Sequence, residues 1–429
     1  TAVFGPVRIV ALPEVTYSTN YAISIDPTDL RFARPLPASR SPFASPFNYV
    51  PYSVDWPYRM GDSAFAKVYP GQSSISAAFR QFEAGASTEN EWWGPAIRNP
   101  ILFSDNAPGF PHAFIRTGKP VETRIGTWEG RWILGGLKES DYFDDDISNN
   151  VRSISAVSVV WKRRPTSGLS IGLARSVFAP ADGFSGVPSH LFDFIKGVGH
   201  PNALPVTDST FTPGPDQIVS LFAHWMLPRY GLETYVEWAR AELPKSIHDF
   251  TLYPNHTRGY TGGLQYAHAF QGGDSRARVQ AEFTNVEQSG TYRFRPMGSF
   301  YTSRAVIQGY TNFGQMLGAG VGPGSSGEWL AADYIRDNIE FGVNFGRTRP
   351  NTDAFFARAN PNRCFHDVIV YPGARAGFTT RFFRVNADYS KITRYNAFFQ
   401  RVRGCASDAT AIGDRPSHYL SLSLSLLGW

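Results

Sequence analysis

The sequence predicts an all-β protein: a closed, antiparallel transmembrane β-barrel with inward-folded loops. The first reason is composition, because aromatic residues make up 15% of the chain, charged residues only 18%, and Gly (40) and Pro (31) are plentiful. So many aromatic residues argue against disorder. The second is that no run of about 18 apolar residues occurs, which excludes transmembrane helices. The third is that many segments alternate apolar and polar residues, as strands with two different faces do.

Four segments alternate most clearly. Apolar residues occupy every second position in 339–345, 383–389, 169–173 and 420–426. The polar positions between them are often small or carry Arg, Asp or Glu, as the packed lumen of a membrane barrel requires. A soluble β-sandwich would show the same period, but aromatic residues gather at the strand ends, as in the aromatic girdles of membrane barrels.

Ten further segments are expected to be strands, which brings the pattern-based total to the middle teens. They are 5–18, 73–83, 124–138, 154–164, 217–227, 231–243, 261–271, 276–288, 328–336 and 367–381. Short turns alternate with long connections, such as 26–57 and 177–215, which is the habit of outer-membrane barrels. We expect a single domain over residues 1–429. The C-terminal strand ends in Trp429 and resembles the signal read by the barrel assembly machinery, an expected partner.

The charge pattern argues against nucleic acid as a partner. The net charge is +5, and 34 of the 41 basic residues are arginine. These arginines are spread along the chain among 36 acidic residues, so no basic stripe forms. Arginine favours fixed, bidentate pairing with carboxylates. The pattern indicates Arg–Asp/Glu pairs inside a lumen, or arginines that face an anionic glycan.

The two cysteines, Cys364 and Cys405, are too few for a disulfide scaffold. They flank one aromatic, arginine-rich segment. We predict a single bridge between them in an oxidising compartment; two free thiols are the alternative.

The sequence contains matches to catalytic and cofactor-binding motifs, but they lack the structural context that these motifs require. Residues 168–172 match G-x-S-x-G, but Ser170 lies within an alternating strand rather than at a strand-to-helix turn. Residues 322–327 match G-x-G-x-x-G outside any βαβ unit. Glu233 and Glu237 share one strand face, where we expect lumen acids paired with arginine more than acid–base catalysts. The histidines lack metal-site spacing. We therefore expect no enzyme activity, no cofactor and no metal.

The segment 87–112 is different. Trp92 and Trp93 are adjacent, so they point to opposite sides of an extended chain, and Gly94-Pro95 then breaks any strand. We expect an irregular insert within or at the mouth of the barrel, with one indole buried and its N–H bonded to an acid or carbonyl. Flat aromatic faces beside amides and carboxylates suit sugars. The alternative is a packed loop that fills the lumen. The candidate glycan-binding residues are Asn90, Glu91, Trp92, Trp93, Arg98 and Asn106.

This segment strongly resembles the capsule assembly protein Wzi family. The resemblance rests on Glu89-Asn-Glu-Trp-Trp-Gly-Pro and Phe103-Ser-Asp-Asn-Ala-Pro-Gly-Phe-Pro-His. Other blocks agree: 55–61, 71–73, 125–132, 233–238 and 309–318. The resemblance implies a bacterial outer-membrane barrel of about eighteen strands that binds or anchors capsular polysaccharide at the cell surface. The helical bundle that the family type member carries before its barrel is not expected in this sequence, because a strand-like pattern begins near Gly5.

We therefore expect a non-catalytic binder of capsular or other surface polysaccharide, surrounded by outer-membrane lipid and lipopolysaccharide. A porin-like channel for small solutes is the alternative. An outer-membrane enzyme is the third class, and it would require a nucleophile and a base within hydrogen-bond reach.

Overall fold

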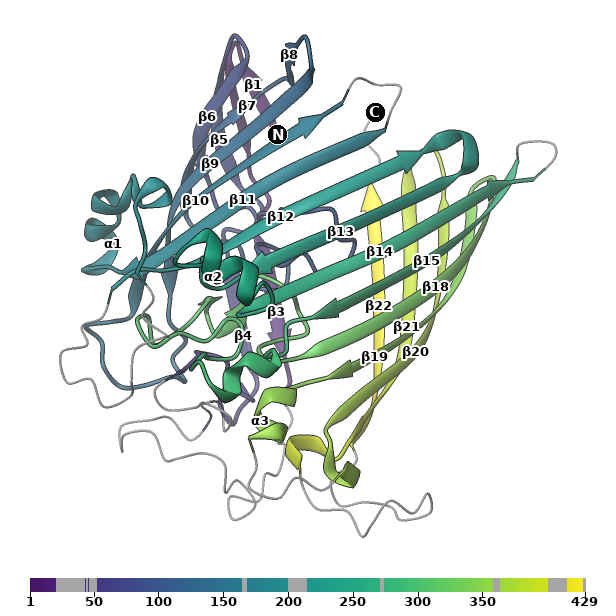
Figure 1. Ribbon diagram of the computed structural model, residues 1–429. Helices are drawn as coiled ribbons and strands as arrows, with labels where there is room; N and C mark the ends of the chain where they lie inside the picture. Colours follow the sequence, from purple (N-terminus) through teal and green to yellow (C-terminus); the bar gives the residue numbers. More distant parts are fainter. Residues whose placement is uncertain are drawn as a thin grey trace.

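The computed structural model describes residues 1–20, 43, 45, 52–163, 168–199, 214–270, 274–357, 363–399 and 415–426. Within these residues an 18-stranded antiparallel sheet forms a curved wall (Figure 1). Its strands are β1 (Ala2–Phe4), β2 (Val7–Val10), β5 (Ser74–Phe79), β6 (Phe82–Ser87), β7 (His112–Thr117), β8 (Val121–Thr123), β9 (Gly126–Lys138), β10 (Val151–Lys162), β11 (Leu169–Pro180), β12 (Asp216–Leu227), β13 (Leu232–Arg240), β14 (Arg258–Ala269), β15 (Ser275–Asn285), β18 (Ser326–Arg336), β19 (Ile339–Arg349), β20 (Val368–Thr379), β21 (Phe383–Tyr395) and β22 (Arg415–Leu426).

Smaller elements lie outside the 18-stranded sheet. Two hairpins pair β3 (Glu14–Ser18) with β4 (Phe65–Tyr69), and β16 (Thr311–Asn312) with β17 (Gln315–Met316). The α-helices are α1 (Gly183–Gly186), α2 (Ile247–Leu252) and α3 (Thr352–Phe356). Short 3₁₀ turns include η1 (Val187–His190) and η2 (Asp193–Ile195). In the described part of the chain, no helix has the length and apolar character needed to cross a membrane.

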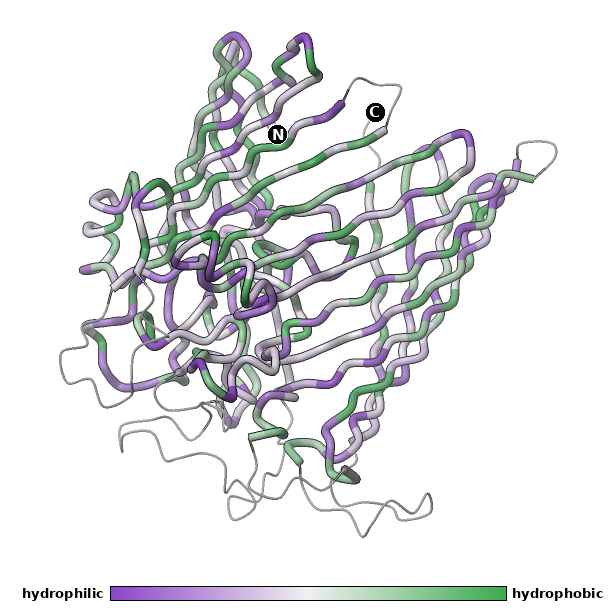
Figure 2. Tube along the Cα trace, viewed as in Figure 1, coloured by the Kyte–Doolittle hydropathy of each residue, from purple (hydrophilic) through white to green (hydrophobic). Residues whose placement is uncertain are grey.

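The outer face of the wall is apolar and exposed. On β22, Leu420, Leu422, Leu424 and Leu426 are all exposed, Leu426 to 83%. These leucines therefore lie outside any protein core. Hydrophobic and hydrophilic positions alternate along the strands in Figure 2. This is the face that a membrane barrel turns toward lipid.

The inner face carries ion pairs on the strands from β15 to β21. The carboxylate of Asp333 is fully buried, and it accepts hydrogen bonds from Arg278 Nε at 2.9 Å and Arg375 Nε at 2.7 Å. Glu340 adds a pair with Arg384 at 3.2 Å. The predicted Arg–Asp/Glu pairs are therefore present on the inner face, where buried carboxylates need such partners.

The two ends of the wall differ. At the short-turn end, neighbouring strands join through a few residues, such as 337–338 between β18 and β19. At the long-loop end, the connections are long, such as 139–150 between β9 and β10 and 286–325 between β15 and β18. In outer-membrane barrels short turns face the periplasm and long loops face outward.

Two expected strands have wrong boundaries. Segment 73–83 is not one strand, because Arg80 adopts a left-handed conformation (φ 54°) and turns the chain between β5 and β6. Segment 5–18 is interrupted between β2 and β3, and β3 pairs with β4 outside the main sheet. Strands β6 and β7 are short and had not been expected as separate strands.

Closure of the barrel stays a prediction. The pairings run without a break from β1 to β22, but among the described residues none joins β22 back to β1. The single-domain assignment also stays a prediction. The predicted Cys364–Cys405 bridge does too, because Cys405 lies outside the described residues.

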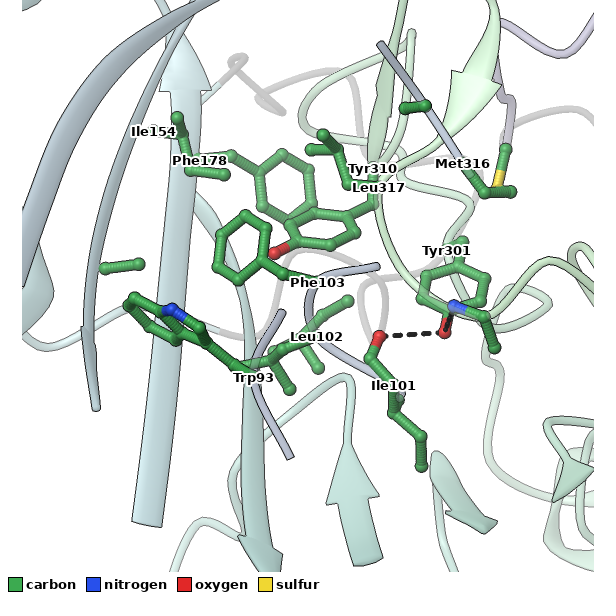
Figure 3. Close-up of a cluster of buried hydrophobic side chains, with 14 of the residues drawn as sticks. Trp93, Ile101, Leu102, Phe103, Ile154, Phe178, Tyr301, Tyr310, Met316 and Leu317 are labelled. Carbon is green, nitrogen blue, oxygen red and sulfur yellow. Dashed lines mark hydrogen bonds between the residues drawn. The ribbon is translucent and has the colours of Figure 1, made fainter. Parts of the chain in front are cut away.

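Two irregular segments pack against the inner face and form a hydrophobic core there. We call residues 88–111 the first insert and residues 286–325 the second insert. From the first insert, Ile101, Leu102 and Phe103 are at most 1% exposed. They share one cluster with Tyr310 of the second insert and with inward wall residues such as Phe178 (Figure 3). The expected irregular insert is present, and it packs against the inner face of the wall.

Candidate functional site

Two carboxylates of the wall hold the first insert in place. Glu282 on β15 accepts hydrogen bonds from the backbone N–H groups of Ile97 (2.8 Å), Arg98 (3.1 Å) and Asn99 (2.8 Å). Glu237 on β13 accepts one from the N–H of Ile101 at 3.1 Å. Irregular backbone that is removed from water needs such partners. These contacts fix the position of the insert along the inner face of the wall.

The expected arginine partners of Glu233 and Glu237 are not what the structure shows. Ser220 donates its hydroxyl hydrogen to Glu237 at 2.7 Å. Glu233 lies 2.9 Å from His224 Nε2 and accepts a hydrogen bond from Gln265 at 3.0 Å. That expectation was wrong, because the insert backbone and neutral or histidine side chains take the place of arginine.

Trp93 is the buried indole. It is 6% exposed, and its Nε1–H donates to Glu91 Oε2 at 2.8 Å. Glu91 also contacts the Arg131 guanidinium and lies 3.0 Å from His112 Nε2. Burial alone raises the pKa of Glu91, but His112, Arg131 and the Trp93 N–H outweigh it, so that this pKa lies below its ordinary value. The predicted buried indole with an acid partner is confirmed.

Trp92 points the other way. Its ring is 41% exposed, and its Nε1–H donates to the carbonyl of Ala96 at 3.1 Å. It lines a cavity of about 680 Å³ that reaches Lys119 and Lys162 near the short turns. We call this the short-turn cavity.

Paired charges surround the short-turn cavity. Lys162 contacts Glu129 at 2.6 Å, and Arg116 contacts Glu83 at 2.8 Å. Ser170 also lines the cavity beside its cross-strand neighbour His224. The described contacts include no hydrogen bond between Ser170 and His224, so this arrangement does not support a serine nucleophile.

A second cavity, of about 610 Å³, lies on the other side of the first insert. Its walls are the β3–β4 hairpin, residues 105–108 of the first insert, and Phe313. Ser74 of β5 pairs with Ser87, directly before the first insert, and so marks the long-loop end of β5. The β3–β4 hairpin continues from β2 and β5 beyond this point. This cavity therefore belongs to the long-loop end, and we call it the long-loop cavity.

The long-loop cavity combines aromatic rings with amides and a carboxylate. Tyr69 and Phe313 meet edge to face, with centroids 6.0 Å apart. Asp105 is exposed, and Asn106 donates an amide hydrogen to the carbonyl of Met316 at 3.0 Å. Rings and fixed polar groups in one cavity can stack on the apolar face of a sugar and bind its hydroxyls.

The six candidate residues do not form one surface. Glu91, Trp92 and Trp93 line the short-turn cavity. Asn106 lines the long-loop cavity, and Asn90 lines both. Arg98 is exposed elsewhere, with its guanidinium 4.9 Å from the ring centroid of Trp329.

Several residues of the site carry no local sequence signal. Glu282 and Arg131 come from wall strands, and only their inward position on alternating strands is visible in the sequence. Tyr69 comes from β4, which was not an expected strand. Among the described residues, no group of three or more His, Cys, Asp or Glu side chains has the arrangement of a metal site.

The fold defines a class: an all-β, outer-membrane-type barrel wall with an apolar outer face and inserts packed on its inner face. The family model of the capsule assembly protein Wzi matches residues 58–354. The chain belongs to the capsule assembly protein Wzi family. This assignment confirms the resemblance and the expected location in the bacterial outer membrane.

One solved structure agrees on the fold. Wzi from Escherichia coli, described as an outer membrane protein involved in group 1 capsule assembly and a carbohydrate-binding β-barrel, matches with a TM-score of 0.58 and 11% identity. The match covers 86% of this chain and 72% of that chain. The outer membrane channel DcaP of Acinetobacter baumannii matches with a TM-score of 0.32 and 10% identity, over 87% and 88% of the two chains. At that TM-score the second likeness supports no conclusion. No curated protein sequence matches this chain.

Proposed function

We propose that this protein is a non-catalytic outer-membrane barrel that binds surface polysaccharide, capsular polysaccharide above all, and anchors it to the cell. The observation that carries the proposal is the long-loop cavity. Tyr69, Phe313, Asp105 and Asn106 bring rings, a carboxylate and an amide together at the end of the wall that faces outward in barrels of this kind. Family membership supports the same function.

The short-turn cavity is the second candidate for the polysaccharide. Its exposed Trp92 ring supports sugar stacking, but the cavity opens toward the end that faces the periplasm in related barrels. A polysaccharide held there would enter from the periplasm or thread past the first insert. Asn90 lines both cavities, so a polysaccharide chain that threads past the insert would pass this residue.

The experiment compares three substitutions to leucine. Tyr69→Leu removes a ring from the long-loop cavity, and Trp92→Leu removes one from the short-turn cavity. Trp225→Leu is the matched control, since Trp225 is 47% exposed and belongs to the outward positions of β12. The measurement is surface-bound polysaccharide in cells whose barrel is shown to be folded by heat-modifiable gel mobility.

We expect Tyr69→Leu to lower polysaccharide retention about 2- to 10-fold, from the roughly 0.5–1.5 kcal/mol of one ring contact. Trp225→Leu should retain the wild-type amount. If only Trp92→Leu lost polysaccharide retention, the binding site would be the short-turn cavity. Unchanged retention in both cavity variants would contradict polysaccharide binding at either place.

Two further measurements separate the alternatives. Labelling by a fluorophosphonate would indicate an activated serine and favour an enzyme. A high single-channel conductance in planar bilayers would favour the porin-like channel, whereas the packed core of the two inserts leads us to expect low conductance.

A further inference from the structure

A groove runs along the outer face of the wall, on the side opposite to the inserts. Ile75, Ala86, Ala113 and Leu134 are successive cross-strand neighbours on β5, β6, β7 and β9. The two alanines in the middle are small, so the surface is recessed between Ile75 and Leu134. The recess has a volume of about 580 Å³.

A flap closes one side of this groove. We define the flap as residues 181–196, which contain α1, η1 and η2 and lie outside the wall beside β9 and β10 (Figure 1). The Phe184 ring covers Gly136, where an added Cβ would collide with it. Val187 of the flap is 8% exposed and packs against Leu134. The flap is therefore part of the groove and not a loose loop.

Polar residues of the wall hold the flap down. Arg175 on β11 donates hydrogen bonds to the carbonyls of Phe194 (2.9 Å) and Lys196 (2.7 Å). Ser155 on β10 donates to the carbonyl of Leu191 at 3.3 Å. An arginine on the outer face of a barrel wall would be costly in lipid, and here it is used to fix the flap. These contacts keep the groove at a defined width.

A lysine stands at the long-loop end of the groove. Lys138 follows Gly136 on the same face of β9, and its Nζ lies 5.5 Å from the Phe184 ring centroid. Its side chain is exposed. The Phe184 ring, which lines the apolar recess, thus lies beside a positive charge, at the end of the wall that faces outward in outer-membrane barrels.

We propose that this groove holds one acyl chain of lipopolysaccharide, with the lipid A phosphate beside Lys138. The groove is continuous with the exposed apolar outer face, where Ile75 (52% exposed) and Ile115 (49%) already meet lipid in a membrane barrel. An anionic headgroup complements Lys138, and the long-loop end places that headgroup in the outer leaflet. This site is independent of the polysaccharide cavities on the inner face.

The test is native mass spectrometry of the folded protein in mild detergent, with purified lipid A as the probe. Ala113→Trp fills the recess. Ala376→Trp is the matched control, because Ala376 lines another outward recess, of about 680 Å³, formed by strands β18 to β22. Lys138→Gln removes the charge and shortens the side chain by only one atom. Heat-modifiable mobility verifies folding of each variant.

We expect wild type and Ala376→Trp to retain one lipid A per chain, and Ala113→Trp to lose at least about tenfold in retention. Lys138→Gln should weaken retention of lipid A about tenfold but leave retention of dephosphorylated lipid A unchanged. Equal retention in Ala113→Trp and wild type would overturn the proposal. An equal loss in both tryptophan variants would also overturn it, since that would indicate unspecific annular lipid.

Discussion

Glu282 and Ile97 are joined by a 2.8 Å hydrogen bond between a carboxylate of the wall and the backbone of the first insert, 185 residues apart in sequence. Two more N–H groups, of Arg98 and Asn99, bond to the same carboxylate, and the Tyr235 hydroxyl donates to it at 2.6 Å. The carboxylate of Glu282 thus accepts hydrogen bonds from three successive backbone N–H groups of the insert. The position of both cavities depends on this attachment.

Glu282→Ala should be among the most destabilising single changes in the wall. It leaves three backbone donors and the Tyr235 hydroxyl without their acceptor, and we expect a loss of about 2–5 kcal/mol in the free energy of unfolding. Urea titration followed by heat-modifiable mobility measures it. Glu328→Ala is the control, because the Glu328–Arg347 pair is exposed, and it should change stability by at most about 0.5 kcal/mol. Equal effects of the two variants would contradict the anchoring role.

The two adjacent tryptophans should behave differently on substitution. Trp93→Ala opens a cavity in the core and removes a donor from Glu91, so we expect a loss of about 3–5 kcal/mol. Trp92→Ala should cost much less, because its ring is 41% exposed. Trp93→Phe keeps most of the volume and loses the N–H, and should cost about 1–3 kcal/mol. Thermal midpoints of the three variants, in the order Trp92→Ala, Trp93→Phe, Trp93→Ala from highest to lowest, check this.

Glu139 predicts a pH dependence of stability. It lies between β9 and β10, and burial, with Asp144 and Asp55 nearby, raises its pKa from 4.5 to about 8, although a hydrogen bond from Gln308 opposes the shift. Between these two values the folded state binds more protons than the unfolded state, so stability falls as the pH rises across this window. Glu139→Gln should flatten that fall, measured as the difference in thermal midpoint between pH 5 and pH 8.5. A variant with the same pH profile as wild type would show that Glu139 ionises normally.

Alkylation tests the predicted Cys364–Cys405 bridge. A bridged pair cannot react with iodoacetamide until a reductant is added. We expect no mass shift without reductant under denaturing conditions, and two added carbamidomethyl groups after reduction. A shift without reductant would support the alternative of two free thiols.

The strands were largely predictable from the sequence, because most exposed outer positions are apolar and many inner ones are polar or small. The alternation in 339–345 and 420–426 marks β19 and β22 directly. The hairpin of β5 and β6 was missed because Arg80 and Gln81 form its turn without glycine, proline or asparagine. A chain that reverses without such residues leaves only one signal, which is that the apolar positions change from odd numbers up to Phe79 to even numbers from Phe82.

The candidate site was only partly predictable. The opposite directions of Trp92 and Trp93 follow from extended geometry, and so does the burial of one of them. The attachment of the insert does not, because Glu237 and Glu282 look like any inward acid of an alternating strand. Their partners are backbone groups more than a hundred residues away, and no spacing in the sequence records that contact. The placement of five candidates at the two cavities, and of Arg98 elsewhere, depends on that attachment.

The unbroken run of pairings from β1 to β22 has a consequence for the number and direction of the strands. Strands β7 and β8 pair with the same edge of β9, so the 18 strands occupy 17 positions around the wall. Sixteen successive antiparallel steps leave β1 and β22 pointing in the same direction. A direct seam between these two edges would be parallel, unlike every other pairing in the sheet. A fully antiparallel ring takes an odd number of additional strands at that seam, and one such strand gives the even total found in bacterial single-chain barrels.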